Sequence, residues 1–162
     1  FQSFVDPGHS LPYFITELTG ISDDMLISAP FIDEILPTLF EFLGSAEDTV
    51  IVAHNSPFDL SFLKAASVAH EIDWPDYLTV DTARLARAVL ERDEVVNCKL
   101  STLAEFFGAT TSPTHRALDD ALATVDVLHG LIERLAGFNV DNFEQMQNFP
   151  SRKKRTKRPV SE

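Results

Sequence analysis

The feature that most restricts the fold is a short apolar run at residues 49–53 (TVIVA) that leads directly into a helix start. Its β-branched residues and its length are typical of a strand buried on both faces of a sheet. Ser56 and Pro57 then match the start of a helix, with serine as the N-cap and proline as the first helical residue. A strand followed at once by a helix predicts an α/β domain.

The same criteria predict the remaining elements. Residues 1–6 alternate apolar and polar side chains and are expected to form a strand, as are residues 77–80. Asp81 is expected to cap a helix ending near Leu90, and Thr114 to cap a long helix over residues 115–136. Pro37 predicts a kink or an early break. Other helical segments are expected at residues 12–18, 22–27, 30–43, 56–70, 101–107 and 141–147.

Length and composition fit one globular domain, because 44% of the 162 residues are hydrophobic. The sequence has no apolar run of about 18 residues, so no membrane partner is expected. Cys98 is the only cysteine, which excludes an intrachain disulfide and a thiolate zinc site and favours a cytoplasmic location. Because a strand is predicted to begin at Phe1, we expect the chain to be cut inside a domain.

Charge divides the chain near residue 150. Residues 1–150 carry 7 basic and 24 acidic side chains, a net charge of −17, and residues 151–162 carry the other six basic residues. A domain this acidic is not typical of proteins that read duplex nucleic acid through a basic face. It can approach a phosphate backbone if divalent metal ions lie between its carboxylates and the phosphates. The basic segment is expected to be a disordered tail or linker, with weak nonspecific nucleic-acid binding as the alternative.

Asp59 follows the strand at residues 49–53 and lies in the first turn of the next helix. In open α/β sheets, ligands bind beyond the carboxyl ends of the strands, so Asp59 is a candidate ligand-binding residue. The alternative is structural, since Ser56 and Asp59 have the spacing of a capping box. Asp81 has a similar ambiguity and is interpreted as a helix cap.

The long helix carries two adjacent carboxylates that point in different directions. Asp119 shares a face with Arg116, Ala123, Asp126 and Glu133, which predicts a solvated face. Asp120 shares a stripe of small and apolar residues that is expected to pack on the sheet, and that comprises Ala117, Ala121, Thr124, Leu128 and Leu131. A partly buried carboxylate needs a metal or a positive partner, so the alternative for Asp120 is a salt bridge to Arg84 or Arg87.

His115 precedes Asp120 by five residues and is expected to lean over the mouth of a site. A histidine beside a metal-bound water can act as a general base near neutral pH, although an ordinary surface or capping role is the alternative. His54 and Asn55 lie near Asp59 in the sequence and are expected to shape the same site.

Together these residues resemble the DEDDh (DnaQ-like) family of 3′–5′ exonucleases. Residues 52–59 (VAHNSPFD) resemble the second motif of this family, and residues 115–121 (HRALDDA) resemble the third, in which a histidine precedes an aspartate by five. Residues 4–22 and residues 99–104 (KLSTLA) resemble the segments that precede those two motifs. The nearest groups are the epsilon proofreading subunit of bacterial DNA polymerase III and PolC-type exonuclease domains.

The resemblance implies an RNase H-like mixed sheet flanked by helices and two divalent metal ions, Mg²⁺ or Mn²⁺. It implies that Asp59 and Asp120 are metal ligands and that His115 is the general base. His54, Asn55 and Phe58 are weaker candidates for substrate contact. The implied reaction releases 5′-mononucleotides from the 3′ end of single-stranded or frayed DNA, in replication proofreading or repair, with a polymerase catalytic subunit as a possible partner.

One part of the family pattern is missing, because the sequence has no Asp-x-Glu. That motif supplies the other two carboxylates of the family, so the first strands of the fold are expected to be absent. Two carboxylates hold a metal pair poorly, and the 162 residues alone are therefore expected to be nearly inactive. An RNA-trimming enzyme of the same family and a non-catalytic module that binds a polymerase or nucleic acid remain alternatives. The expected boundaries are an exonuclease domain at residues 1–138, a helical extension at 139–150 and the tail.

Overall fold

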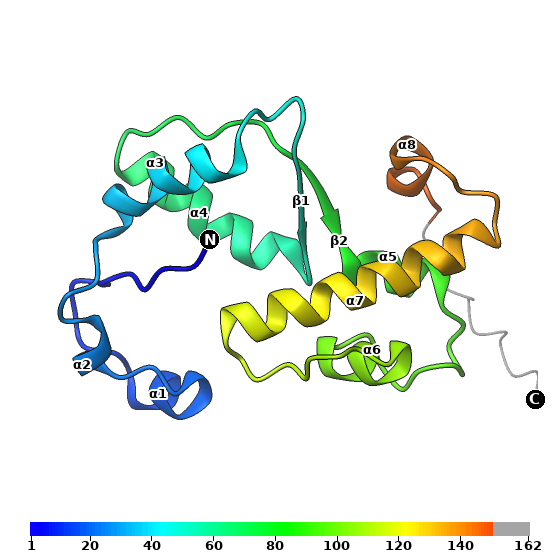
Figure 1. Ribbon diagram of the computed structural model, residues 1–162, viewed down its shortest axis with the longest axis horizontal. Coiled ribbons are helices and arrows are strands. Elements are labelled where there is room, and N and C mark those ends of the chain that lie inside the picture. The colour runs from blue at the N-terminus through cyan, green and yellow to red at the C-terminus, as the bar shows by residue number, and fades with distance from the viewer. Residues whose placement is uncertain (151–162) are drawn as a thin grey trace, which may run out of the picture.

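The computed structural model describes residues 1–150. Two parallel strands, β1 (Val50–Ala53) and β2 (Leu78–Asp81), pair in a register that places Ala53 opposite Asp81. In Figure 1 the strands stand between two groups of helices. One group comprises α1 (Tyr13–Thr19), α2 (Asp23–Leu26), α3 (Ile32–Leu43) and α4 (Ser56–Ala69), and the other comprises α5 (Thr82–Val89), α6 (Leu100–Phe107), α7 (Ala117–Ala136) and α8 (Phe143–Gln147).

The α/β class is confirmed, but two expectations about the strands are wrong. Residues 1–6 do not form a strand, because nothing within residues 1–150 pairs with them as a strand, and Asp6 N–H donates instead to the carbonyl of Pro30 at 2.9 Å. β1 is only partly buried, since β2 is its one partner in the described chain. The sheet in residues 1–150 is therefore parallel and two-stranded, not mixed. The expected tail at residues 151–162 lies outside the described residues.

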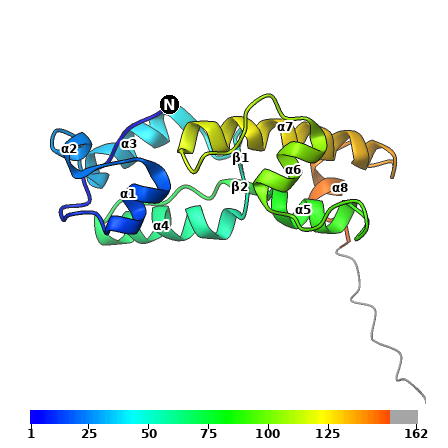
Figure 2. The same ribbon diagram turned by 90° about the horizontal axis from the view of Figure 1, so that it is seen from below.

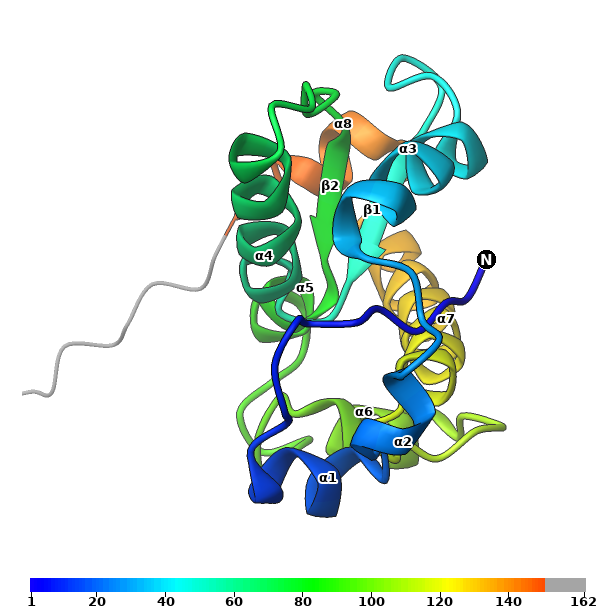
Figure 3. The ribbon, with the colours of Figure 1, turned by 90° about the vertical axis from the view of Figure 1, so that its left-hand side faces the viewer.

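Helix α3 runs without interruption through Pro37, so of the kink or early break expected there, the break is wrong. Phe31 is the N-cap residue of this helix, and its backbone N–H donates to the side chain of Glu34 at 3.0 Å. Proline in this position removes a single intrahelical hydrogen bond, which a capped helix tolerates. Helices α3 and α4 contact each other, and Figure 3 views the molecule from the side of this N-terminal group of helices.

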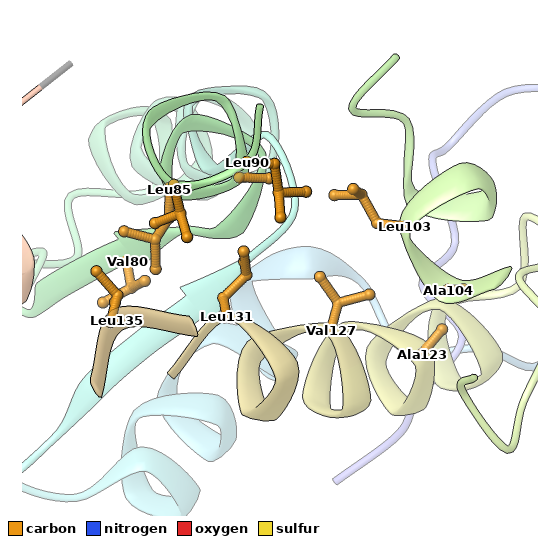
Figure 4. Close-up of a cluster of buried hydrophobic side chains, with 11 residues drawn as sticks. Val80, Leu85, Leu90, Leu103, Ala104, Ala123, Val127, Leu131 and Leu135 are labelled. Atoms are coloured by element: carbon orange, nitrogen blue, oxygen red, sulfur yellow. The ribbon is translucent and has the colours of Figure 1, made fainter. Parts of the chain in front are cut away.

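The core is centred on α7, which packs against α5 and α6. Figure 4 shows Val127 and Leu131 of α7 facing Leu85, Leu90 and Leu103. Gly130 permits this close approach, because a Cβ at that position would lie within 3.0 Å of the Phe107 ring. Apolar residues of the C-terminal segment, including those of α8, cover the same core: Val140, Phe143, Met146 and Phe149.

The end of the molecule that carries α8 is well separated from the N-terminal helices in Figure 2. Residues 138 to 150 thus contribute to the same hydrophobic core as α7, which joins the short helical extension physically to the domain. Within residues 1–150, every helix is too short or too polar to cross a lipid bilayer.

The loop between α6 and α7 is fastened by acidic side chains of α7. Asp126 Oδ2 accepts hydrogen bonds from the backbone N–H of Thr110 at 2.8 Å and from its hydroxyl at 2.9 Å. These two bonds, the backbone one foremost, lower the pKa of Asp126. Asp119 Oδ2 accepts from the Thr114 hydroxyl at 2.6 Å. The face that carries these two acids is therefore occupied in holding the loop, not simply solvated as predicted.

Replacing Asp126 with asparagine is expected to make stability less dependent on pH. The folded pKa of Asp126 lies below its unfolded value, so its charge stabilises the fold above about pH 4 and this contribution disappears as pH falls through the folded pKa. Asp126→Asn should lower the melting temperature at neutral pH, and the gap should close in acid. Glu133→Gln on the same helix is the control, and a gap that stays constant with pH would contradict the assignment.

Candidate active site

One cleft of about 1000 Å³ collects most of the residues singled out in the sequence. Asp59 reaches it from α4, Asp120 from α7, and His115 from the loop just before α7. His54 and Asn55, at the turn after β1, also line it. These residues come from separate parts of the chain, and the fold brings them together where β1 ends and α7 passes the strands (Figure 1).

Asp81 fixes the ends of the two strands relative to each other. Its Oδ1 accepts from Ala83 N–H at 2.9 Å and from Arg84 N–H at 3.3 Å, so the predicted cap of α5 is confirmed. The same oxygen accepts from the backbone N–H of Asn55 at 3.0 Å. Asn55 has a left-handed backbone with φ of 68°, which asparagine adopts more easily than most residues. Asp81 therefore holds the sharp turn from β1 into α4.

His54 is held at both ring nitrogens. Nε2–H donates to the Cys98 carbonyl at 3.1 Å, and Nδ1 is hydrogen-bonded to the Thr82 hydroxyl at 3.0 Å. Burial, the largest influence, lowers the pKa of His54 and favours the neutral ring that accepts at Nδ1. With both ring nitrogens engaged, His54 is better placed to build the wall of the cleft than to contact a substrate. A role in shaping the site was expected from its position in the sequence, and its contact with a substrate stays a prediction.

Asp59 is not part of a capping box. Asn55 occupies the N-cap of α4, Ser56 is already helical, and no side-chain capping bond forms at this end of the described helix. The residue is exposed at the cleft, yet partial desolvation of its carboxyl group raises the pKa of Asp59. A bound cation would offset that desolvation. The alternative that Asp59 forms a capping box with Ser56 is wrong, because no such capping bond forms in the described helix.

Asp120 faces the cleft and holds the loop that carries His115. Its Oδ1 accepts from the backbone N–H of Thr114 at 3.1 Å and of His115 at 3.3 Å. No arginine within residues 1–150 forms a salt bridge with Asp120, so the predicted alternative of an ion pair is wrong. Its second carboxylate oxygen makes no hydrogen bond within the described chain, which leaves it available for a ligand.

The start of α7 differs from the prediction. Arg116 is the N-cap and the helix begins at Ala117, so Thr114 does not cap it and His115 lies before it. His115 is exposed and has a left-handed backbone with φ of 63°. The carboxylates of α7 reach back to Thr114 and His115, and this reversed arrangement replaces the expected threonine cap.

The faces of α7 are also rotated relative to the prediction. Ala123, assigned above to a solvated face, is fully buried, and the packed stripe is Ala123, Val127, Leu131 and Leu135. The stripe of Asp120 that was expected to pack on the sheet mostly lines the cleft instead, through Ala117, Ala121, Thr124 and Leu128. Small side chains therefore surround Asp120, as predicted, and they border the cleft, while Leu131 of the same stripe is buried in the core.

Phe58 lies outside the residues that line the cleft. It is 61% exposed on α4 and contacts Phe62, with 5.0 Å between ring centroids. Two residues that line the cleft, Arg87 and Lys99, had no predicted role in binding. Arg87 appeared only as a possible partner of Asp120. Lys99 opens the segment at residues 99–104 that resembles the family, but that resemblance assigned it no binding role.

Comparison with known proteins agrees with the motif analysis. The profile of the RNase T family, described as exonuclease, matches residues 1–128. A Mycobacterium tuberculosis protein described as a bifunctional exonuclease/endonuclease is 48% identical over 92% of this chain and 23% of its own length. PolC-type DNA polymerase III of Caldanaerobacter subterraneus is 38% identical over 91% of the chain and 10% of the polymerase. The chain thus spans less than a quarter of each of these relatives.

The fold is also similar to a solved structure, Exonuclease X in complex with 5′ overhanging duplex DNA. The TM-score is 0.65, and the match covers 90% of this chain and 78% of that one. Sequence identity is 21%, so this similarity concerns the fold. The RNase H-like part of the fold prediction agrees with this match, although the described sheet has only two strands.

Proposed function

The chain belongs to the RNase T family of exonucleases, and on that premise we propose that its complete protein hydrolyses single-stranded DNA from the 3′ end and releases 5′-mononucleotides. One observation carries the proposal. Asp59, Asp120 and His115 come from separate segments and line the same cleft. Two carboxylates and a histidine around one space suit phosphodiester hydrolysis, in which a water must lose a proton and the phosphate must be neutralised.

Divalent metal ions are typical cofactors of this family, and we assign Asp59 and Asp120 as ligands for them. When bound, such ions lower the pKa of water and stabilise charge on the phosphate. The described residues alone do not complete a metal site, since no group of three His, Cys, Asp or Glu side chains within residues 1–150 is arranged to hold a metal ion. Val52 and Ala53 of β1 line the cleft, and β1 is paired on one side only in the described chain. A further strand with two carboxylates would complete both the sheet and the ligand set.

His115 is proposed as the general base. Its ring is exposed at the cleft, while its backbone N–H is held by Asp120 at 3.3 Å. This contact holds the His115 backbone beside the carboxylate without using either ring nitrogen, so the neutral ring can take a proton from water. Phe58, exposed on α4, is proposed to stack on a base of the strand, a contact that does not depend on sequence.

The alternative is a non-catalytic module that retains the fold and binds nucleic acid or a polymerase. The residues that precede Phe1 in the complete protein separate the two readings, since an Asp-x-Glu there favours the enzyme and its replacement favours the module. The names of the polymerase relatives support a polymerase partner under either reading. The relatives do not separate DNA from RNA as substrate.

Digestion of 5′-labelled oligonucleotides by the complete natural protein tests the proposal. With Mg²⁺ we expect a ladder that shortens from the 3′ end, faster on DNA than on RNA, and no digestion with EDTA. Residues 1–162 alone should be nearly inactive under the same conditions. Binding without digestion by the complete protein would favour the non-catalytic module, and robust digestion by residues 1–162 would show that the metal site is complete without further carboxylates.

A further inference from the structure

Two basic side chains line the cleft beside the acidic ones. Arg87 projects from α5, and Lys99 is the N-cap residue of α6. Both residues are exposed. They are notable because residues 1–150 have a net charge of −17 and contain only seven basic residues. A polyanion that approaches such a domain is repelled unless cations are concentrated at the point of contact.

Most other basic residues of the described chain are engaged elsewhere. Arg84 donates to the Gln147 carbonyl at 3.0 Å, Arg134 pairs with Glu94, and Lys64 lies over the Trp74 ring. The side chains of Arg87 and Lys99 form no ion pair within residues 1–150. Two exposed cations without a carboxylate partner, in a cleft that contains Asp59 and Asp120, are available for an anionic ligand.

The wall that His54 builds lies next to both cations and fixes the backbone that carries Lys99. The His54 ring holds the Cys98 carbonyl, and the Asn97 side chain accepts the Lys99 backbone N–H at 2.9 Å. Lys99 therefore extends from a fixed backbone. Burial is the largest cause of the lowered pKa of His54. The positive charge of Arg87 lowers this pKa further, and the negative charge of Asp120 raises it, so both groups lie near the His54 ring. Arg87 and Asp120 thus act on the same imidazole from within one cleft.

We propose that Arg87 and Lys99 bind backbone phosphates of a nucleic-acid strand next to the scissile one and guide the strand past the carboxylates of this cleft. This inference rests on the proposed function, because it assumes a phosphodiester strand as ligand. Arginine and lysine bind phosphate through charge-assisted hydrogen bonds, and such contacts position a strand without reading its sequence. Arg87 and Lys99 are positioning residues in this proposal, and they take no part in the proton transfer.

The salt dependence of binding provides the test. Binding of a fluorescent single-stranded oligonucleotide to the complete protein is measured in EDTA, so that hydrolysis cannot consume the probe. Each phosphate contact to a single strand contributes about 0.7 to the slope of log affinity against log salt. Arg87→Gln and Lys99→Gln should each lower that slope by about 0.7 and weaken binding about fivefold at low salt. Arg92→Gln, which removes an exposed charge outside the cleft, is the matched control and should change neither quantity.

A chemically modified probe identifies the phosphates themselves. Neutral methylphosphonate groups replace one phosphate at a time from the 3′ end. In the wild type, one or two positions should weaken binding, and in each variant the position that contacts the replaced side chain should have no further effect, because its partner charge is already gone. Circular dichroism should show unchanged folding, since both side chains are exposed.

The possible outcomes separate this inference from the proposed function. A slope that is unchanged in both variants, or lowered equally by Arg92→Gln, overturns the phosphate contacts even if the protein digests DNA. A lowered slope in a protein that binds but does not digest DNA supports these contacts and overturns the exonuclease proposal. Absence of oligonucleotide binding by the wild type in EDTA overturns the phosphate contacts, while digestion of DNA by the same protein with Mg²⁺ tests the proposed function separately.

Discussion

Asp120→Asn is expected to reduce metal-dependent turnover by about a thousandfold or more in the complete protein, because charge stabilisation by a metal is worth several kcal/mol. Asparagine keeps the oxygen that accepts from the backbone N–H groups of Thr114 and His115, so the loop should stay in place. The substitution therefore removes a charge from the cleft with little change in shape.

Asp119→Asn is the matched control. This substitution also removes one charge from the first turn of α7, and the asparagine oxygen can still accept from the Thr114 hydroxyl. Asp119 does not line the cleft, so turnover should change by about twofold at most. The measurements are initial rates over a range of Mg²⁺ concentrations and the melting temperature of each variant. Equal losses in the two variants would refute the distinction between the two carboxylates.

His115→Ala is expected to slow the chemical step by about 10²- to 10⁴-fold, the usual contribution of a general base. Metal affinity should stay nearly unchanged, because the backbone N–H of residue 115 still donates to Asp120. Residue 115 has φ of 63°, and alanine in this conformation costs about 1 kcal/mol, so a second variant is needed.

His115→Asn supplies that second variant, because asparagine tolerates a left-handed backbone and cannot act as a base near neutral pH. Both variants should lose the same amount of rate in single-turnover digestion, while Mn²⁺ titration followed by calorimetry should give wild-type affinity. A collapse of metal affinity in both variants would show that the imidazole is a metal ligand. Wild-type rates in His115→Asn would show that the imidazole is not needed for proton transfer.

Local sequence signals were sufficient where the interacting groups are neighbours in the chain. The strand at Val50–Ala53 and the Asp81 cap were both predicted, since each depends on groups a few residues apart. The strand expected at residues 1–6 was wrong because alternation describes a surface that needs a partner strand, and none is present within residues 1–150.

The same limit applies to the start of α7. Thr114 has a good capping side chain, but its hydroxyl donates to Asp119, and helix formation begins three residues later. The packed face of α7 was also displaced, because hydrophobic spacing alone does not say whether small residues meet a neighbouring helix or border a cleft. Ala121 lines the cleft while Ala123 is buried, although both are alanines on one helix.

By itself, the sequence determined the α/β class and the two motifs, one with Asp59 and the other with His115 and Asp120, because spacing within a motif is a local property. Only the tertiary structure decided that Asp59 does not cap its helix, that Asp120 lacks an arginine partner in the described chain, and that Arg87 and Lys99 enter the same cleft. The physical reason is that each of these outcomes depends on which groups compete for one oxygen or one space, and those groups are far apart along the chain.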